Sequence, residues 1–195
     1  MAENKKKTGS GRALRTLELR YRPVFDIHLN MAIDYEISML INDKVMGVML
    51  PKLFVPIAEK TNQIVQLNLW EIEEACEAIK RCEEREADLN SIIVQISVKS
   101  FSKKNFVSQV KKILDKHGIA PDRFCFDINE SILEAVKDQV MENIMAFREM
   151  GLKVSINDFG LEYTSLTHLA HYDVDYIGLH KSLLDGIMNR IQGNV

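Results

Sequence analysis

Hydrophobic and polar residues repeat along this chain with two different periods, which replace each other in turn. Residues 16–27 alternate Leu17, Leu19 and Tyr21 with charged residues, so they predict a β-strand whose side chains point to opposite faces. Residues 32–40 predict a second extended segment. Residues 58–85 instead place apolar side chains every three to four positions, which predicts one long amphipathic helix.

The rest of the chain alternates predicted strands and helices with a repeat of roughly thirty residues, the size of a strand-helix-strand unit. The predicted strands are 91–98, 123–130, 152–159 and 174–180, and the predicted helices are 106–114, 132–150, 165–172 and a last one from 181. This alternation indicates an α/β fold with parallel strands joined by right-handed crossovers. A doubly wound open sheet and a (β/α) barrel both fit the pattern. The chain lacks GxGxxG and phosphate-loop motifs, which weakens the nucleotide-binding forms of the open sheet.

Polar side chains stand at or near the ends of four predicted strands: Gln95, Asp127, Asn157 with Asp158, and His180. In a barrel the carboxyl ends of the strands meet on one face, where (β/α) enzymes build their sites. Carboxylate and amide oxygens there would suit Mg²⁺, Mn²⁺ or Ca²⁺. Each residue taken alone fits equally well as a cap of the following helix.

Composition narrows the class of protein. The chain has 195 residues, enough for one domain with its own core, and a formal charge of -3 that favours neither a nucleic acid polymer nor a membrane as partner. Its three cysteines show no metal-ligand spacing and are typical of a reduced cytoplasmic protein. We expect residues 1–16 to form a disordered basic tail and residues 17–195 to form the domain.

Several segments, in the right order, resemble the EAL domain, the bacterial cyclic di-GMP phosphodiesterase family. These are YEISML at the position of the Glu-Ala-Leu signature, LFVPIAEKTNQI (53–64), VQIS, FDINES, the loop NDFGLEYTSL and YIGLH. The resemblance implies a TIM-like barrel whose first strand runs antiparallel to the others. The chain stops before the family's last strands, so the resemblance also implies a C-terminally truncated barrel.

The family's chemistry, as the resemblance implies it, is two-metal hydrolysis of one phosphodiester bond of cyclic di-GMP. Five positions correspond to its metal-binding residues: Glu36 and Asp158 are retained, Gln95 replaces an asparagine, Asp127 replaces a glutamate and Asn157 replaces an aspartate. Gly178 replaces the lysine that works near the attacking water. Around them, Arg22 replaces a glutamine, Leu40 a phosphate-contacting arginine, and His180 an aspartate.

These replacements predict a catalytically inactive EAL-like domain that acts as a regulatory or protein-interaction module. Lost anionic ligands weaken the binding of hard cations, so we expect no resident cofactor and at most weakly bound Mg or Mn at Glu36, Asp127 and Asp158. Two alternatives remain open: a cyclic di-GMP receptor without hydrolysis, and an active metal-dependent phosphodiesterase.

We also expect a protein partner or a homodimer. An incomplete barrel would expose unpaired strand edges, which favour pairing with another chain. The family's loop after the fifth strand commonly serves dimer contacts, and the resemblance places Phe159, Gly160, Tyr163 and Leu166 in that loop. In the same loop, Glu162 replaces a glycine of the family.

Overall fold

The strands form one curved sheet in a computed structural model that describes residues 15–130, 138–160, 173–183 and 185. The strand order is β1-β2-β4-β5-β6-β7, with β3 paired to β2. The bounds are β1 Arg15–Asp26, β2 Met31–Asp43, β3 Gly47–Met49, β4 Ser91–Gln95, β5 Phe124–Asn129, β6 Lys153–Phe159 and β7 Tyr176–Leu179.

The order of the strands decides between the two candidate architectures. From β2 onward each strand pairs in parallel with the next long strand along the chain, without the reversal of order that defines a doubly wound sheet. Strand β1 pairs with β2 in antiparallel fashion. The arrangement is therefore of the barrel type, and the predicted antiparallel first strand is confirmed.

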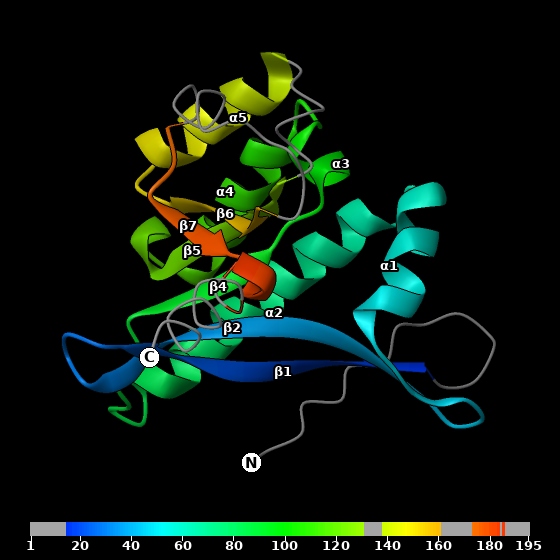
Figure 1. The fold of residues 1–195 in the computed structure, drawn as a ribbon, viewed down its shortest axis with the longest axis horizontal. Coiled ribbons are helices and arrows are strands. Elements are labelled where there is room, and N and C mark those ends of the chain that lie inside the picture. The colour runs from blue at the N-terminus through cyan, green and yellow to red at the C-terminus, as the bar shows by residue number, and fades with distance from the viewer. Residues whose placement is uncertain (1–14, 131–137, 161–172, 184, 186–195) are drawn as a thin grey trace, which may run out of the picture.

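Strands β1 and β2 form a long twisted ribbon that crosses the rest of the sheet (Figure 1). A similar turn closes each end of β2. Asp26 Oδ1 accepts hydrogen bonds from the backbone N–H groups of His28 and Leu29, at 2.8 and 2.9 Å. Asp43 Oδ1 accepts from those of Val45 and Met46, at 2.8 and 3.0 Å. These aspartates stabilise the turns because a short carboxylate reaches backbone donors two residues ahead.

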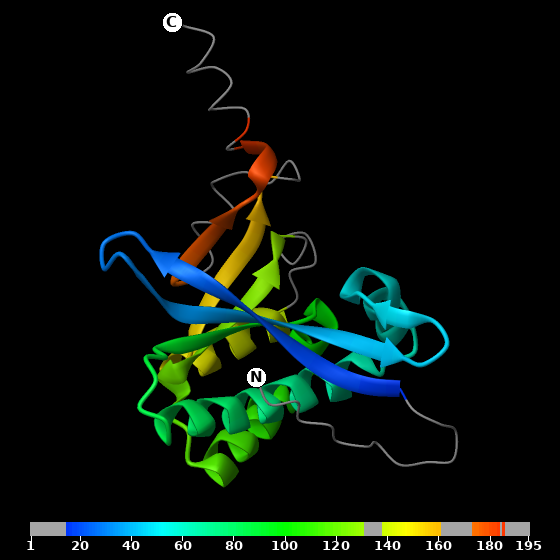
Figure 2. The ribbon, with the colours of Figure 1, turned by 90° about the horizontal axis from the view of Figure 1, so that it is seen from below.

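The helices are α1 Pro51–Lys60, α2 Ile64–Glu83, α3 Val98–Phe101, α4 Phe106–His117 and α5 Asp138–Glu149, with a 3-10 turn at Pro121–Arg123. Helix α1 stands at one end of the β1–β2 ribbon, whereas α2 to α5 gather on one face of the sheet (Figure 2). The buried core lies between these helices and the outward-facing residues of β4, β5 and β6. None of the described helices is long and apolar enough to cross a bilayer.

Phenylalanine rings fill the centre of this core. Phe126 of β5 meets Phe147 of α5 with ring centroids 5.1 Å apart, and Phe101 of α3 meets Phe147 at 5.4 Å. Phe106 of α4 also packs against Phe147, at 5.9 Å. The contacts are edge-to-face, the geometry that aromatic quadrupoles favour, and they join three helices to the sheet.

The predicted helix over 58–85 is wrong as a single element. It is the end of α1 followed by α2, with Asn62 in the left-handed region at φ 57° between them. Thr61 ends α1, and its hydroxyl donates to the carbonyl of Ile57 at 2.9 Å. The apolar spacing from Ile64 onward predicted α2 correctly, but it carries no information about where the preceding helix stops.

Smaller differences concern boundaries. The predicted strand over 91–98 ends at Gln95, because Ser97 begins α3 by accepting the backbone N–H of Lys99 on its side chain. Strand β1 begins at Arg15, two residues inside the predicted tail. Strand β3 was not predicted. The predicted helix over 165–172, most of the last helix and residues 131–137 lie outside the described residues.

Candidate functional site

The candidate site is built from the inward-facing side chains near the carboxyl ends of the strands. Strand side chains alternate between faces, and the outward positions of β4 to β6 pack against the helices. The inward positions are therefore Glu36, Gln95, Asp127, Asn157 and Gly178. The register staggers them: Glu36 pairs with Ile93, Gln95 with Asp127, and Asn129 with Asn157. Such a stagger is expected where strands tilt in a barrel.

Asp127 lies deepest in this group. Its side chain is almost fully buried, and Oδ1 accepts a hydrogen bond from the hydroxyl of Ser155 on β6 at 2.5 Å. The pKa of Asp127 is raised to about 6. Burial is the main cause, and the carboxylates of Glu36 and Asp158 also raise this pKa, whereas hydrogen bonds from Ser155 and Asn157 lower it. Glu36 and Asp158 thus lie near enough to Asp127 to act on it electrostatically.

Glu36 forms an ion pair with Arg22. The two residues stand directly opposite each other on the antiparallel strands β1 and β2, so their side chains lie on the same face of the ribbon. Arg22 Nη2 donates to Glu36 Oε2 in a close contact. The glutamate is the more buried partner, with 28% of its side chain exposed against 74% for Arg22.

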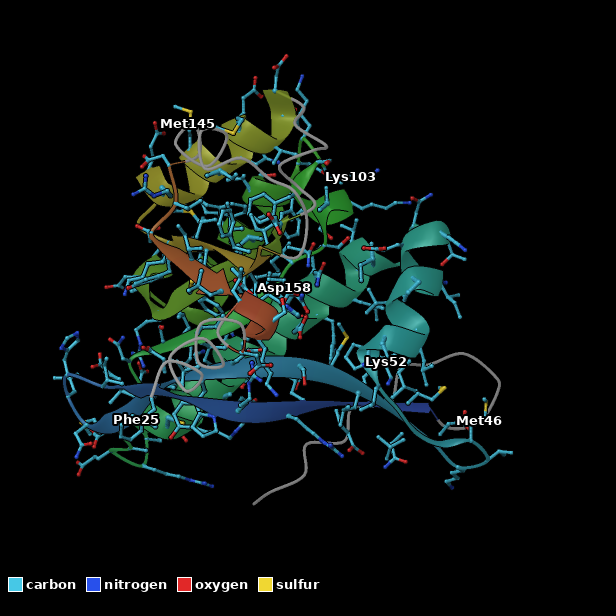
Figure 3. The ribbon with its side chains drawn as sticks, viewed as in Figure 1. Phe25, Met46, Lys52, Lys103, Met145 and Asp158 are labelled. Atoms are coloured by element: carbon cyan, nitrogen blue, oxygen red, sulfur yellow. The ribbon has the colours of Figure 1, made fainter. Side chains whose placement is uncertain are left out.

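Asn157 and Asp158 play different parts at the end of β6. Asn157 Oδ1 accepts the backbone N–H of Asp158 at 2.8 Å, and Asp158 lies in the left-handed region at φ 58°. Asp158 Oδ2 accepts a hydrogen bond from Asn129 Nδ2 at 3.3 Å. Figure 3 labels Asp158 at the end of its strand, near the centre of the molecule.

Gly178 touches Asn157 across β6 and β7. A Cβ atom on residue 178 would lie 2.6 Å from Asn157 Oδ1, well inside van der Waals contact. The amide of Asn157 therefore occupies the space where a side chain at position 178 would start. His180, two residues later, accepts the backbone N–H of Ser182 on Nδ1 at 3.2 Å and so caps the start of a helix.

Two of the four predicted loop residues are described. Phe159 is buried in the core at the end of β6, and Gly160 has φ 96°. The backbone N–H of Gly160 donates to Glu130 Oε2 at 3.0 Å, which ties this loop to the end of β5. Tyr163 and Leu166, like Glu162, lie outside the described residues.

A cavity of about 440 Å³ opens beside the mouth, between α1, α2 and the ends of β2 and β4. Its lining is mixed: apolar side chains such as Ile37, Pro56 and Ile64 alternate with Glu59, Asn68 and Glu71. Asn68 joins α2 to the sheet, because its Nδ2 donates to the carbonyl of Gln95 at 3.2 Å and its Oδ1 accepts from Ser100 Oγ at 2.8 Å.

The residues present do not fit a pair of divalent cations. Among the described residues, no group of three or more His, Cys, Asp or Glu side chains is close enough to hold a metal ion. Two-metal hydrolysis needs ions about 3.5–4 Å apart, held mainly by shared carboxylates. Asn157 contributes no charge at this position, and Glu36 is already paired with a guanidinium.

Sequence reasoning missed the Arg22–Glu36 pair, Ser155, Asn68 and Glu71. The first two depend on strand register, which the alternation pattern leaves undefined. The polar residues Asn68 and Glu71 on the apolar face of α2 were a signal that could have been noticed, because a polar residue at a core position needs a reason.

Comparison with known protein families matches residues 11–194 to the EAL domain. Among curated proteins, the chain is 28% identical over 137 residues to the signaling protein YkoW of Bacillus subtilis, covering 70% of this chain and 17% of that protein. It is 29% identical over 140 residues to the bifunctional diguanylate cyclase/cyclic di-GMP phosphodiesterase MucR of Pseudomonas aeruginosa, covering 71% and 20%. The chain thus spans about a fifth of the length of these relatives.

Solved structures show the same fold. A PaMucR phosphodiesterase in complex with c-di-GMP aligns with a TM-score of 0.80 and 26% identity, over 88% of this chain and 70% of that one. The FimX EAL domain of Xanthomonas citri, also in complex with c-diGMP, aligns with a TM-score of 0.74 over 85% and 64% of the two chains. At 21% identity this second likeness shows the fold alone.

Proposed function

The chain belongs to the EAL domain family, and on that premise we propose that it acts in bacterial cyclic di-GMP signalling as a regulatory or protein-interaction module that does not hydrolyse the dinucleotide. Its relatives include a cyclic di-GMP phosphodiesterase, so the ligand class follows from kinship. The residues at the mouth of the barrel support the absence of hydrolysis.

The contact between Asn157 and Gly178 carries this proposal. The family resemblance implies an aspartate at the first position and a lysine at the second, and neither residue here bears a charge. The amide oxygen of Asn157 stands 2.6 Å from where a Cβ on residue 178 would lie, so the site has no room for that lysine without rearrangement. Removing one group that stabilises a transition state commonly lowers the rate by about 10²–10³.

A cyclic di-GMP receptor without hydrolysis is the second candidate. The cavity of about 440 Å³ beside the mouth favours it, because small-molecule sites are commonly concave pockets of roughly 300–1,000 Å³. Fold neighbours such as the PaMucR phosphodiesterase hold c-di-GMP in their structures. Against it, the position of the family's phosphate-contacting arginine is Leu40, whose side chain is buried.

Two measurements test the proposal. The protein is incubated with cyclic di-GMP and Mg²⁺ or Mn²⁺, and the linear dinucleotide is sought by chromatography, with the MucR phosphodiesterase as positive control. Cyclic di-GMP is then titrated calorimetrically, with the metal and with a chelator. We expect no linear product.

The outcomes separate the candidates. Turnover that depends on the metal and disappears in Asp127→Asn would overturn the proposal in favour of an active phosphodiesterase. Saturable binding without product would select the receptor. If neither linear product nor binding of cyclic di-GMP is observed, the interaction module is the candidate that remains. The exposed apolar surfaces of the molecule provide a basis for that role.

Those surfaces lie at the two ends of the β1–β2 ribbon, where Figure 3 labels Phe25 and Met46. At one end Phe25, Ile27 and Leu29 are exposed, Ile27 to 80%. At the other end Val45 and Met46 are exposed, Val45 to 93%, together with Leu53 and Ile57 of α1. Clustered apolar exposure of this kind marks interaction sites in soluble proteins, which supports a protein partner or a homodimer.

A further inference from the structure

We propose that Arg22 is the resident cation of this site: its guanidinium takes, at Glu36, the position that the family chemistry gives to a metal ion. The inference rests on the proposed non-catalytic function, which it deepens by naming what replaces the metal. It concerns the binding of ions, whereas the proposed function concerns the formation of product, so the two can fail separately.

Strand register enforces the pairing. Arg22 and Glu36 are directly opposed on β1 and β2, and opposed residues on antiparallel strands have Cβ atoms roughly 4.5–5.5 Å apart. The two side chains therefore meet without any rearrangement of the backbone. Arg22 is the more exposed of the two side chains, so its guanidinium meets the Glu36 carboxylate from the solvent side.

Arg22 carries a permanent positive charge that, unlike that of a metal ion, does not have to be taken up from solution. A guanidinium stays protonated throughout the range in which the protein is folded, so its competition with a metal ion for Glu36 persists. A divalent ion bound to the same carboxylate would stand beside a fixed positive charge and would be repelled by it. Either the metal ion or Arg22 can occupy this position, and Arg22 is tethered there.

The other two carboxylates of the mouth are also engaged by protein donors. The hydroxyl of Ser155 donates to Asp127 at 2.5 Å, and the side-chain amide of Asn129 donates to Asp158 at 3.3 Å. All three thus have a donor supplied by the fold, and Arg22 is the charged one among them.

The test measures Mn²⁺ binding by the free protein, without nucleotide, from the loss of the free-ion signal in electron paramagnetic resonance. We compare the wild type with Arg22→Gln, which keeps a polar side chain and removes the charge. The matched control is Arg20→Gln, which removes the same charge two residues earlier on the same face of β1, opposite Ser38 rather than a carboxylate. Arg22→Lys keeps the charge and completes the set.

We expect weak Mn²⁺ binding in the wild type, Arg20→Gln and Arg22→Lys, with Kd on the order of 1 mM. Arg22→Gln should bind roughly tenfold more tightly. The double variant Arg22→Gln/Glu36→Gln should return to the weak value, because the freed carboxylate is then gone.

Two results would overturn the inference: wild-type protein that binds Mn²⁺ as tightly as Arg22→Gln, or a gain in Arg20→Gln equal to that in Arg22→Gln. Thermal unfolding by circular dichroism checks that every variant is folded. If Arg22→Gln does not fold, Arg22→Lys against Arg22→Met at the same position gives the same comparison of charge. Tight wild-type Mn²⁺ binding without linear dinucleotide would refute this inference and leave the proposed function standing.

Discussion

Asn157 and Gly178 show how two residues on neighbouring strands constrain each other. Asn157 Oδ1 accepts the backbone N–H of Asp158 at 2.8 Å, and that hydrogen bond fixes the amide against the backbone of residue 178. The amide can leave only by giving up this bond, at a net cost of about 1 kcal/mol. Restoring a side chain at position 178 therefore requires a change at position 157 as well.

This constraint predicts that Gly178→Ala is destabilising. In most strands alanine in place of glycine stabilises, by roughly 0.5–1 kcal/mol. Here we expect a loss of about 1–2 kcal/mol in the free energy of unfolding, from displacement of the Asn157 amide. Urea unfolding measures it.

A double-mutant cycle between positions 157 and 178 tests whether the Asn157 amide causes this loss of stability. In an Asn157→Ala background the obstruction is gone, so Gly178→Ala should become neutral or stabilising there. Equal effects of Gly178→Ala in both backgrounds would show that the two residues do not interact.

Some of these residues could be read from the sequence and others could not. Asp127 and Asn157 could be predicted because they stand near the carboxyl ends of strands, and the resemblance to the EAL domain added Glu36. The structure brings the three residues to the same mouth. The partner of Glu36 could not be read, because a one-residue change in the register of β1 would turn Arg22 to the other face. That register depends on the length of the turn at Asp26 and on a bulge between Val24 and Phe25.

At the scale of elements, helix α2 combines a structural and a functional face. Its spacing of apolar residues predicted the helix, and Ile64, Ile72 and Ile79 are buried as expected. The same helix carries Glu71 into the wall of the cavity, with 3% of the residue exposed. Asn68 Nδ2, 3.4 Å away, is its hydrogen-bond partner.

Glu71 should make the stability of the protein depend on pH. Burial raises the pKa of Glu71 from 4.5 to about 8 in the folded state. Between these values the unfolded chain has released the proton that the folded chain retains, so the free energy of unfolding falls as the pH rises. The contribution is about 1.4 kcal/mol per pH unit between roughly pH 5 and pH 8.

Urea unfolding at several pH values checks this expectation. Glu71→Gln should remove the loss of stability between roughly pH 6 and pH 8, above the pKa of Asp127. Glu84→Gln, an exposed change at the end of the same helix, should leave that loss unchanged. If wild type and Glu71→Gln have parallel stability profiles, Glu71 is ionised in the folded protein at neutral pH.

At the scale of the whole molecule, the periodicity of the sequence predicted most of the strands, because that pattern is local, but it fitted a doubly wound sheet and a barrel equally well. The barrel type and the antiparallel first strand were predicted from the resemblance to the EAL domain. The sequence did not predict the break between α1 and α2, and with it the cavity that these helices border. A cavity is a property of tertiary packing, and residues from α1, α2, β2 and β4 contribute to it together.

The exposed ends of the β1–β2 ribbon predict self-association. We expect the sedimentation coefficient to rise with protein concentration, because association removes apolar surface from water. The double change Val45→Lys/Met46→Lys should reduce this rise if the end near α1 is the contact, and Ile27→Lys should do so if the opposite end is. Both sets are highly exposed, so unfolding temperatures should barely change. A monomer at all concentrations, in wild type and variants alike, would contradict the expectation of a homodimer.

The phenylalanine cluster affects when the protein can fold during its synthesis on the ribosome. Its rings come from α3, α4, β5 and α5, so the last of them, Phe147, leaves the exit tunnel long after the β1–β2 ribbon has emerged. Until then the ribbon lacks the packed helical layer that supports the sheet. A nascent chain halted before this ring should be readily cut by proteases, and one released after it should resist them.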